Sequence, residues 1–211
     1  MEAGLEVAAD LSEAGDFAGA LALLGGRGAS ARAAALRGWC LENLGRPNEA
    51  AAAYRVALRI DPAHLEALEG LANVLWSLGE EEGAARRWLA VVEAVALAER
   101  PSAREFELAG WSLYRLGRLE EAEQALRRAV ALDQSAPSNR FDLGLVLLAR
   151  GKEEAARAEY GRAIALSWGG SEGAIAVALD DLLQASLDPS VVDPIAQMLG
   201  GTTAPAAREE A

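Results

Sequence analysis

Residues 31–64 read ARAAALRGWCLENLGRPNEAAAAYRVALRIDPAH, and this stretch decides the fold. Its first, apolar segment ends at Gly45, which is placed to adopt the left-handed backbone conformation that stops a helix. A second, alanine-rich segment follows and closes at Asp61-Pro62, where the next helix must begin. The stretch therefore predicts a pair of antiparallel helices joined by a tight turn.

The same pattern recurs along the chain in four columns, each with spacings of 30, 34, 38 and 34 residues. The columns are Ala8, Gly38, Ala72, Gly110 and Gly144; Gly15, Gly45, Gly79, Gly117 and Gly151; Ala20, Ala50, Ala84, Ala122 and Ala156; and the bulky Leu24, Tyr54, Trp88, Leu126 and Tyr160. Small residues let two helices approach closely, and the bulky residues fill the space between them. Since one helix pair cannot bury its apolar face alone, the columns predict a stack of pairs.

The two irregular spacings each differ from 34 by four residues, which is close to one helical turn. The first unit is expected to lose a turn near Leu24, where Gly25 and Gly26 break the helix. The longer interval is expected to add a turn along the stretch from Glu80 to about Arg100, before Pro101 opens the next element.

Composition supports an all-α fold. The chain of 211 residues is 52% hydrophobic and 25% charged, so it can bury a core. Alanine and leucine, which favour helices, are abundant, and threonine occurs only at Thr202 and Thr203.

Charge and side-chain chemistry exclude several classes of function. The net charge of −12 argues against nucleic-acid binding, which usually needs a basic face. A single cysteine and a single histidine leave no intrachain disulfide, thiolate metal cluster or histidine pair. No stretch approaches the roughly 20 apolar residues of a membrane span, and we see no secretory signal. We therefore expect a cytoplasmic, non-enzymatic protein without cofactor, metal or membrane insertion.

The repeated pattern resembles that of the tetratricopeptide repeat (TPR) family. Within residues 31–64 the family's signature positions hold Gly38, Leu41, Leu44, Gly45, Ala50, Tyr54, Ala57, Ile60 and Pro62. The resemblance implies an all-α, right-handed solenoid of antiparallel helix pairs with a C-terminal capping helix. The sequence departs from the family at the first aromatic position, which holds Ala34, Leu68, Phe106 and Arg140.

We interpret the chain as an array of repeats followed by a less regular C-terminal region. The ranges are a shortened first TPR-like repeat at 1–30, repeats at 31–64, 65–98, 103–136 and 137–170, a capping helix at 171–188, a short amphipathic helix at 189–200 and a disordered tail at 201–211. The second helix of the repeat at 65–98 is expected to extend to about residue 102.

The resemblance also implies a concave groove, lined by the first helix of each repeat, that binds a peptide or helix of another protein. The candidate binding residues are Arg32, Trp39, Asn43, Asn73, Trp76, Arg104, Trp111, Tyr114, Arg115, Phe141 and Leu145. Glu42 and Glu69 also fall at groove-facing positions, and Trp88 is expected in the core. Aromatic residues and arginine often dominate interface energetics, which favours a protein-interaction adaptor.

Three arrangements of these aromatic side chains remain open. In the first, the side chains line an open ligand groove. In the second, they lie under the chain's own residues 185–199, and in the third they pack in the core. The alternative function is a structural assembly protein that forms a homo-oligomer or closes its groove with its own C-terminal segment. An enzyme or small-molecule binder is the least supported hypothesis.

Overall fold

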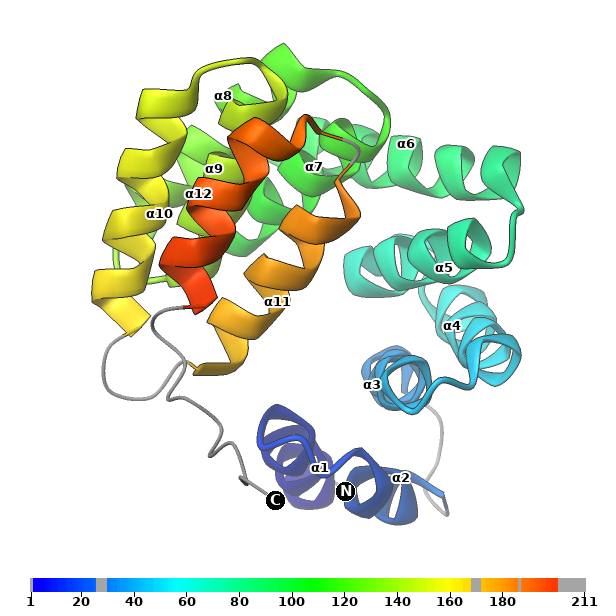
Figure 1. Ribbon diagram of the computed structural model, residues 1–211. Coiled ribbons are helices and arrows are strands. Elements are labelled where there is room, and N and C mark those ends of the chain that lie inside the picture. The colour runs from blue at the N-terminus through cyan, green and yellow to red at the C-terminus, as the bar shows by residue number, and fades with distance from the viewer. Residues whose placement is uncertain (1, 26–29, 168–171, 186, 201–211) are drawn as a thin grey trace, which may run out of the picture. The chain divides into compact units, whose positions relative to one another are not determined.

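The computed structural model describes residues 2–25, 30–167, 172–185 and 187–200. These residues form twelve helices and no strand, which confirms the predicted all-α fold (Figure 1). The chain divides into two compact units, residues 1–99 and 100–211, and each is described by itself. The tail predicted to be disordered, residues 201–211, lies outside the described residues.

The first unit consists of three successive helix pairs. Its helices are α1 (Glu2–Glu13), α2 (Phe17–Leu24), α3 (Ala31–Asn43), α4 (Pro47–Ile60), α5 (Leu65–Ser77) and α6 (Glu81–Leu97). The first helices of the pairs, α1, α3 and α5, also pack on one another. Over the described residues no comparable packing joins α2 to α4 or α4 to α6. The first helices therefore form the inner layer of this unit.

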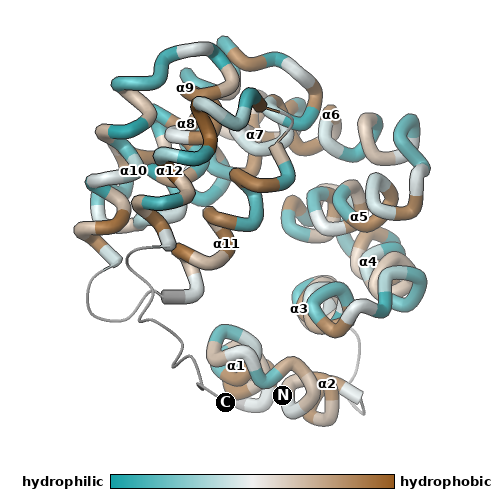
Figure 2. The backbone as a smooth tube through the Cα atoms, in the orientation of Figure 1, coloured by the Kyte–Doolittle hydropathy of each residue, from teal (hydrophilic) through white to brown (hydrophobic). Residues whose placement is uncertain are grey.

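The second unit contains two further pairs and a C-terminal helical hairpin. Its helices are α7 (Ala103–Arg115), α8 (Leu119–Leu132), α9 (Pro137–Ala149), α10 (Glu153–Ser167), α11 (Glu172–Gln184) and α12 (Pro189–Gly200). α11 packs against α9 and less extensively against α10, and α12 packs against α10 and α11. Hydrophobic and hydrophilic residues alternate along these helices, as expected for elements that bury one face (Figure 2).

The glycine column ends the first helix of every pair, as the sequence predicts. Gly15, Gly45, Gly79, Gly117 and Gly151 all have positive φ angles, between 68° and 83°. At the turn after α3 the Gly45 amide donates to the Glu42 carbonyl at 2.9 Å, and the Arg46 amide donates to the Leu41 carbonyl at 2.9 Å. These bonds satisfy carbonyls that the helix end would otherwise leave without partners.

The bulky column lies in the core, between the two helices of each pair. Tyr54 is 2% exposed and Trp88 is 1% exposed, which confirms the core position predicted for Trp88. A Cβ added at Gly38 would lie 2.7 Å from the Tyr54 ring, and one added at Gly144 would lie 2.7 Å from the Tyr160 ring. The column that contains Gly38 and Gly144 therefore holds only glycine or alanine, because the bulky side chains of the paired helix occupy the space that a larger residue would need.

The helix lengths explain the irregular spacings. α2 ends at Leu24 after 8 residues and α6 has 17, against 14 in α4. However, α6 ends at Leu97 and not at about residue 102. Ala98 has an extended backbone, and a residue that precedes a proline, here Arg100 before Pro101, disfavours the helical conformation. The division into repeat units remains an interpretation of the sequence.

The departures from the family's first aromatic position have different structural solutions. Arg140 pairs with Glu159 of α10 at 2.8 Å, and both side chains are largely buried, with exposures of 14% and 11%. Glu159 also pairs with Arg162 on its own helix. At the preceding repeat, the Arg128 guanidinium lies 5.5 Å from the centre of the Phe106 ring. A buried ion pair thus replaces an aromatic contact at position 140.

Candidate functional site

Two predicted binding residues of the first unit present large aromatic surfaces to solvent. Trp39 on α3 is 38% exposed, and Trp76 on α5 is 45% exposed. Each indole is held by a second ring. Phe17 meets Trp39 edge-on with ring centres 5.5 Å apart, and Trp88 lies 5.7 Å from Trp76. These two tryptophans are therefore positioned by aromatic contacts while part of each ring remains accessible.

The predicted polar residues of the first unit make contacts within the chain. Arg32 forms an exposed ion pair with Glu6 at 2.7 Å, and the Asn43 side-chain amide donates to the Trp39 carbonyl at 2.9 Å. Asn73 accepts a hydrogen bond from the Trp88 indole at 3.3 Å and donates to Glu69 at 3.1 Å. The hydrogen bond from the buried Trp88 thus orients the side-chain amide of Asn73.

A partly buried acidic network lies next to Trp39 on α3. The Tyr54 hydroxyl donates to Glu42 Oε2 at 2.9 Å, across the α3–α4 pair. Burial raises the pKa of Glu42 to about 7; the Tyr54 hydrogen bond opposes this effect, and repulsion from Glu69 adds to it. Glu42 therefore changes its charge near neutral pH.

In the second unit, three predicted residues form an aromatic and basic cluster on α7. The rings of Trp111 and Tyr114 are 5.5 Å apart, and the Arg115 guanidinium lies 6.0 Å from the Trp111 ring centre. Burial raises the pKa of Tyr114 and lowers the pKa of Arg115. Arg104, in the first turn of α7, pairs with Glu107 at 2.9 Å.

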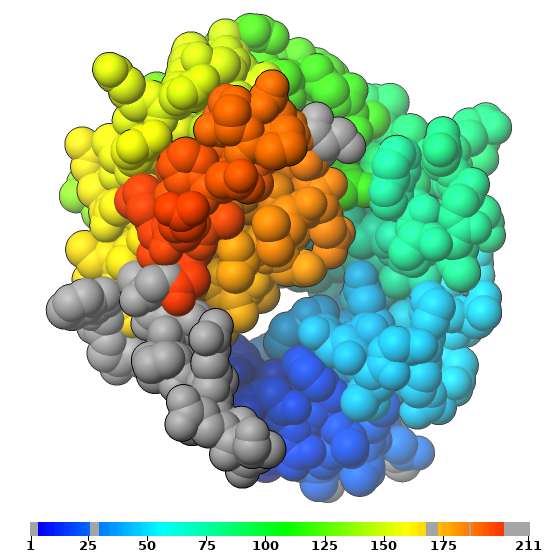
Figure 3. Space-filling view, in the orientation of Figure 1, coloured from blue at the N-terminus to red at the C-terminus, as the bar shows by residue number. Residues whose placement is uncertain are grey.

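Phe141 and Leu145 do not present the accessible apolar surface that the sequence predicts. They are only 4% and 2% exposed. Their helix α9 packs against α10, α8 and α11, and the Phe141 ring lies 5.9 Å from the ring of Tyr160 on α10. In the space-filling view α11 (orange) and α12 (red-orange) form a continuous surface beside α10 (Figure 3). The helix that packs on α9 is α11, residues 172–184, whereas one of the three open arrangements places residues 185–199 over the aromatic side chains. Both residues are therefore removed from the candidate binding surface.

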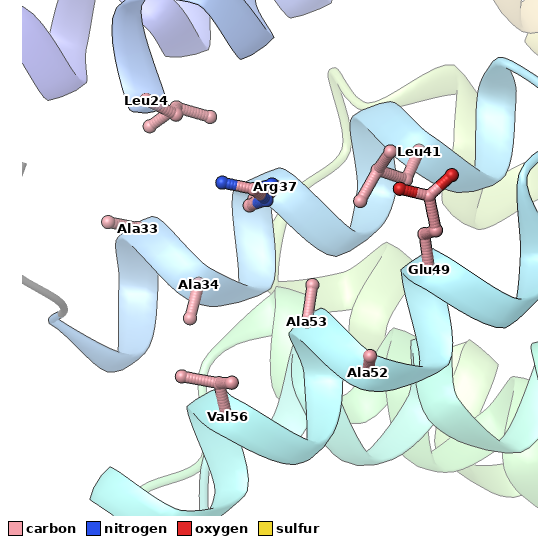
Figure 4. Close-up of a pocket in the computed structure, with 9 residues that line it drawn as sticks. All are labelled: Leu24, Ala33, Ala34, Arg37, Leu41, Glu49, Ala52, Ala53 and Val56. Atoms are coloured by element: carbon pink, nitrogen blue, oxygen red, sulfur yellow. The ribbon is translucent and has the colours of Figure 1, made fainter. Parts of the chain in front are cut away.

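A pocket that the sequence analysis did not identify opens between α2, α3 and α4. Its volume is about 350 Å³, and Figure 4 shows its largely apolar lining. The lining residues are Leu24, Ala33, Ala34, Arg37, Leu41, Glu49, Ala52, Ala53 and Val56. The pocket lies where the short α2 ends at Leu24, so the missing helical turn was the signal that could have indicated it.

The described residues contain no group of three or more histidine, cysteine, aspartate or glutamate side chains arranged to hold a metal ion. Burial raises the pKa of the Cys40 thiol, as expected for a packed small side chain. None of the described helices is long and apolar enough to cross a membrane.

Comparison with protein families finds two matches. Both are to family models described as "Tetratricopeptide repeat", one over residues 31–64 and the other over residues 107–171. No curated protein matches the chain.

Solved structures show a similar fold. A thermophilic TPR protein of Thermus thermophilus is 20% identical, with 86% of this chain and 98% of that chain covered and a TM-score of 0.69. Pseudomonas aeruginosa pilF is 20% identical, with 94% and 88% covered and a TM-score of 0.57. A fragment of MamA from Desulfovibrio magneticus is 21% identical, with 80% and 96% covered and a TM-score of 0.51. At these identities the similarity is evidence for the fold alone.

Proposed function

Because the chain belongs to the tetratricopeptide repeat family, we propose that it is a non-catalytic adaptor that binds a peptide or helix of another protein. In the first unit the binding surface would be the solvent-facing side of the first helices α3 and α5. In the second unit α7 would carry a candidate surface of its own. Partner binding would rely on a surface whose backbone is already in place, with little rearrangement.

The observation that carries this proposal is the exposure of Trp39 and Trp76 on the inner helix layer, at 38% and 45%. Tryptophan side chains are highly buried on average, and they are enriched among the residues that dominate binding energy. Two partly exposed tryptophans on neighbouring, packed helices are therefore favourable anchor points for a partner.

The candidate surface of the second unit lies on α7. Trp111 and Tyr114 would supply apolar area, while Arg104 and Arg115 would orient backbone or acidic groups of the ligand. The net charge of −12 favours a protein partner over nucleic acid. The cytoplasmic location expected from the sequence is part of this proposal.

Affinity capture from lysate of the source cell tests the proposal. The wild type would be compared with Trp39→Ala/Trp76→Ala and, separately, with Trp111→Ala/Tyr114→Ala. The matched control is Leu89→Ala/Leu97→Ala, because these exposed leucines lie on the second helix α6. Circular dichroism would check that each variant keeps its helix content.

The adaptor proposal expects a protein that the wild type and the control retain and that the tryptophan variant loses. Equal capture by the wild type and both aromatic variants would contradict the assigned surface.

The alternative function, a structural assembly protein, is favoured by one specific observation. α11 of the C-terminal region packs on α9, the helix that carries Phe141 and Leu145, and both residues are buried. This packing supports a groove that is partly closed by the chain's own C-terminal region. Light scattering over a concentration series separates the two functions. A stable homo-oligomer that buries Trp39 and Trp76 would favour assembly, whereas a monomer that captures a foreign protein would favour the adaptor.

A further inference from the structure

We propose that the surface around Trp39 and Glu42 recognises a cationic side chain of the partner, preferably arginine, and that it does so in a proton-dependent manner. This inference rests on the proposed function, because it specifies the chemistry of the ligand that the first unit would bind. The occupant is a basic peptide segment of another protein.

The geometry brings an aromatic face and a carboxylate together on one helix. Trp39 and Glu42 are three residues apart on α3, so their side chains are neighbours on the same face. Phe17 supports the indole from one side, with ring centres 5.5 Å apart. A guanidinium can stack on an indole while it forms hydrogen bonds with a carboxylate, which is why arginine fits this pair better than lysine.

The Glu42 carboxylate is fixed before any ligand arrives. Its Oε2 accepts the Tyr54 hydroxyl at 2.9 Å, and Tyr54 is itself 2% exposed. A Cβ added at Gly38 would lie 2.7 Å from the Tyr54 ring, and one added at Gly70 would also collide with this side chain, so the tyrosine has little room to move. Because one oxygen is occupied by this bond, the other is the available acceptor for a ligand.

The two side chains that act on Glu42 are Tyr54 and Glu69, and neither carries a positive charge. Cys40 lies on the same helix, Tyr54 is on α4, and Glu69 is on α5 with Asn73 as a hydrogen-bond donor. Among the residues described, no arginine or lysine forms an ion pair with Glu42. Partial burial without a counter-charge disfavours the ionised carboxylate, so a cationic ligand would stabilise it.

Charge complementarity selects the class of partner. The protein has a net charge of −12, and Glu69 adds negative potential beside Glu42. Complementary charges speed association and disfavour partners of the same sign. An acidic segment or a free terminal carboxylate would therefore be rejected at this surface.

Binding of a cation is linked to proton release. Burial raises the pKa of Glu42 to about 7, and a neighbouring positive charge would lower it again. With that pKa, Glu42 is about nine-tenths ionised at pH 8 and about one-tenth ionised at pH 6. If only the ionised form binds, affinity for the cation rises about tenfold over this interval.

The test uses short, dye-labelled peptide pools with a fixed central residue and mixed residues elsewhere, added to the full chain. The central residue is arginine, lysine, glutamate or citrulline, which keeps the shape of arginine without its charge. Fluorescence anisotropy would measure binding between pH 6 and pH 8. The variants are Glu42→Gln, which keeps an acceptor for Tyr54, and Glu93→Gln, which removes an exposed charge on α6.

The expected result is about tenfold tighter binding of the arginine pool than of the citrulline pool at pH 8. Glu42→Gln should reduce arginine binding to the citrulline level and remove the pH dependence, while Glu93→Gln should leave both intact. Tyr54→Phe removes the donor that stabilises the ionised carboxylate, so it should move the midpoint of the pH dependence upward. Equal binding of the arginine and citrulline pools, or no binding of any pool, would overturn the inference.

The outcome for the proposed function is separate. If pools bind without preference for arginine and lose affinity in Trp39→Ala, the adaptor stands and only its ligand chemistry is wrong. If no pool and no captured protein depends on Trp39, both proposals fail.

Discussion

Replacement of Glu123 by glutamine should destabilise the second unit. Glu123 on α8 is 5% exposed, yet its carboxylate is surrounded by three cationic side chains. Arg127 donates to Oε1 at 2.9 Å and Lys152 to Oε2 at 2.8 Å, and Arg150 also pairs with Oε2. Since Arg150 and Lys152 flank the turn between α9 and α10, this carboxylate joins two neighbouring helix pairs.

The magnitude follows from the pKa of this group. Burial alone would raise it, but hydrogen bonds from Lys152, Arg127 and Arg150 lower it from 4.5 to about 2. At about 1.4 kcal/mol for each tenfold change, this corresponds to about 3 kcal/mol of stability at neutral pH. Glutamine keeps the shape and one acceptor but leaves the three cations without their counter-charge. We expect the free energy of unfolding to fall by about 2–3 kcal/mol.

The pH dependence has a definite sign. A carboxyl with a lowered pKa in the folded state stabilises the fold above its unfolded pKa and loses that effect as pH falls. The difference between wild type and Glu123→Gln should therefore be full above about pH 5 and shrink between about pH 4.5 and pH 2. Protonation of other carboxylates affects both proteins equally and cancels in the difference.

Urea unfolding followed by far-ultraviolet circular dichroism measures this difference at each pH. Hydrogen exchange of the α8 and α9 amides would assign the loss to the second unit. Glu121→Gln on the same helix is the matched control, because Glu121 pairs with Arg118 at the solvent-exposed surface and its loss should matter much less. A change below about 1 kcal/mol at pH 7, or a difference that does not vary with pH, would refute the reasoning.

Two further experiments test the packing. Gly144→Ala should destabilise the fold by about 1–3 kcal/mol in urea unfolding, because its Cβ would lie 2.7 Å from the Tyr160 ring. In the control Gly161→Ala the added Cβ meets open space, so that change should be neutral or stabilising. Equal effects of the two substitutions would contradict the described packing. Leu182 on α11 is 0% exposed, so Leu182→Ala should lower the free energy of unfolding by about 2–5 kcal/mol and increase hydrogen exchange of the α11 amides. An unchanged exchange rate would show that packing of its apolar face does not hold α11 in place.

The helical framework could be predicted because its determinants are local or strictly periodic. Gly117 ends its helix through its own backbone conformation, with a φ of 72°, and this requirement is visible as one residue type at one position. Trp88 and Tyr160 recur in register with residues that face the same interior space, so their burial follows from the period alone.

The errors arose where the repeated columns do not specify the structure. Phe141 and Leu145 occupy groove-facing positions, but α11 packs on their helix, and no column in the sequence specifies where α11 docks. The end of α6 at Leu97 was misplaced because the spacing of 38 residues fixes the total length between columns but not how it divides between helix and loop.

The hydrogen bond between Glu42 and Tyr54 could not be predicted from the repeated columns. Glu42 falls at a groove-facing position and Tyr54 falls in the interior column, so the sequence separates them. Only the packing of α3 on α4 brings the hydroxyl within 2.9 Å of the carboxylate, at a place where Tyr54 is buried and Glu42 is partly buried. The raised pKa of Glu42 is a consequence of that burial, which a residue's type and position do not reveal.

Site-specific photo-crosslinking tests the central claim most directly, because it reports which surface touches a partner. Benzoylphenylalanine would replace Trp39 on the inner layer or, in a second protein, Leu97, which is 85% exposed at the end of α6. After irradiation in source-cell lysate, mass spectrometry would identify the crosslinked peptides. The adaptor account predicts a segment of another protein crosslinked at position 39 and not at position 97. Crosslinks at position 97 alone, or only to a second copy of this chain, would contradict it.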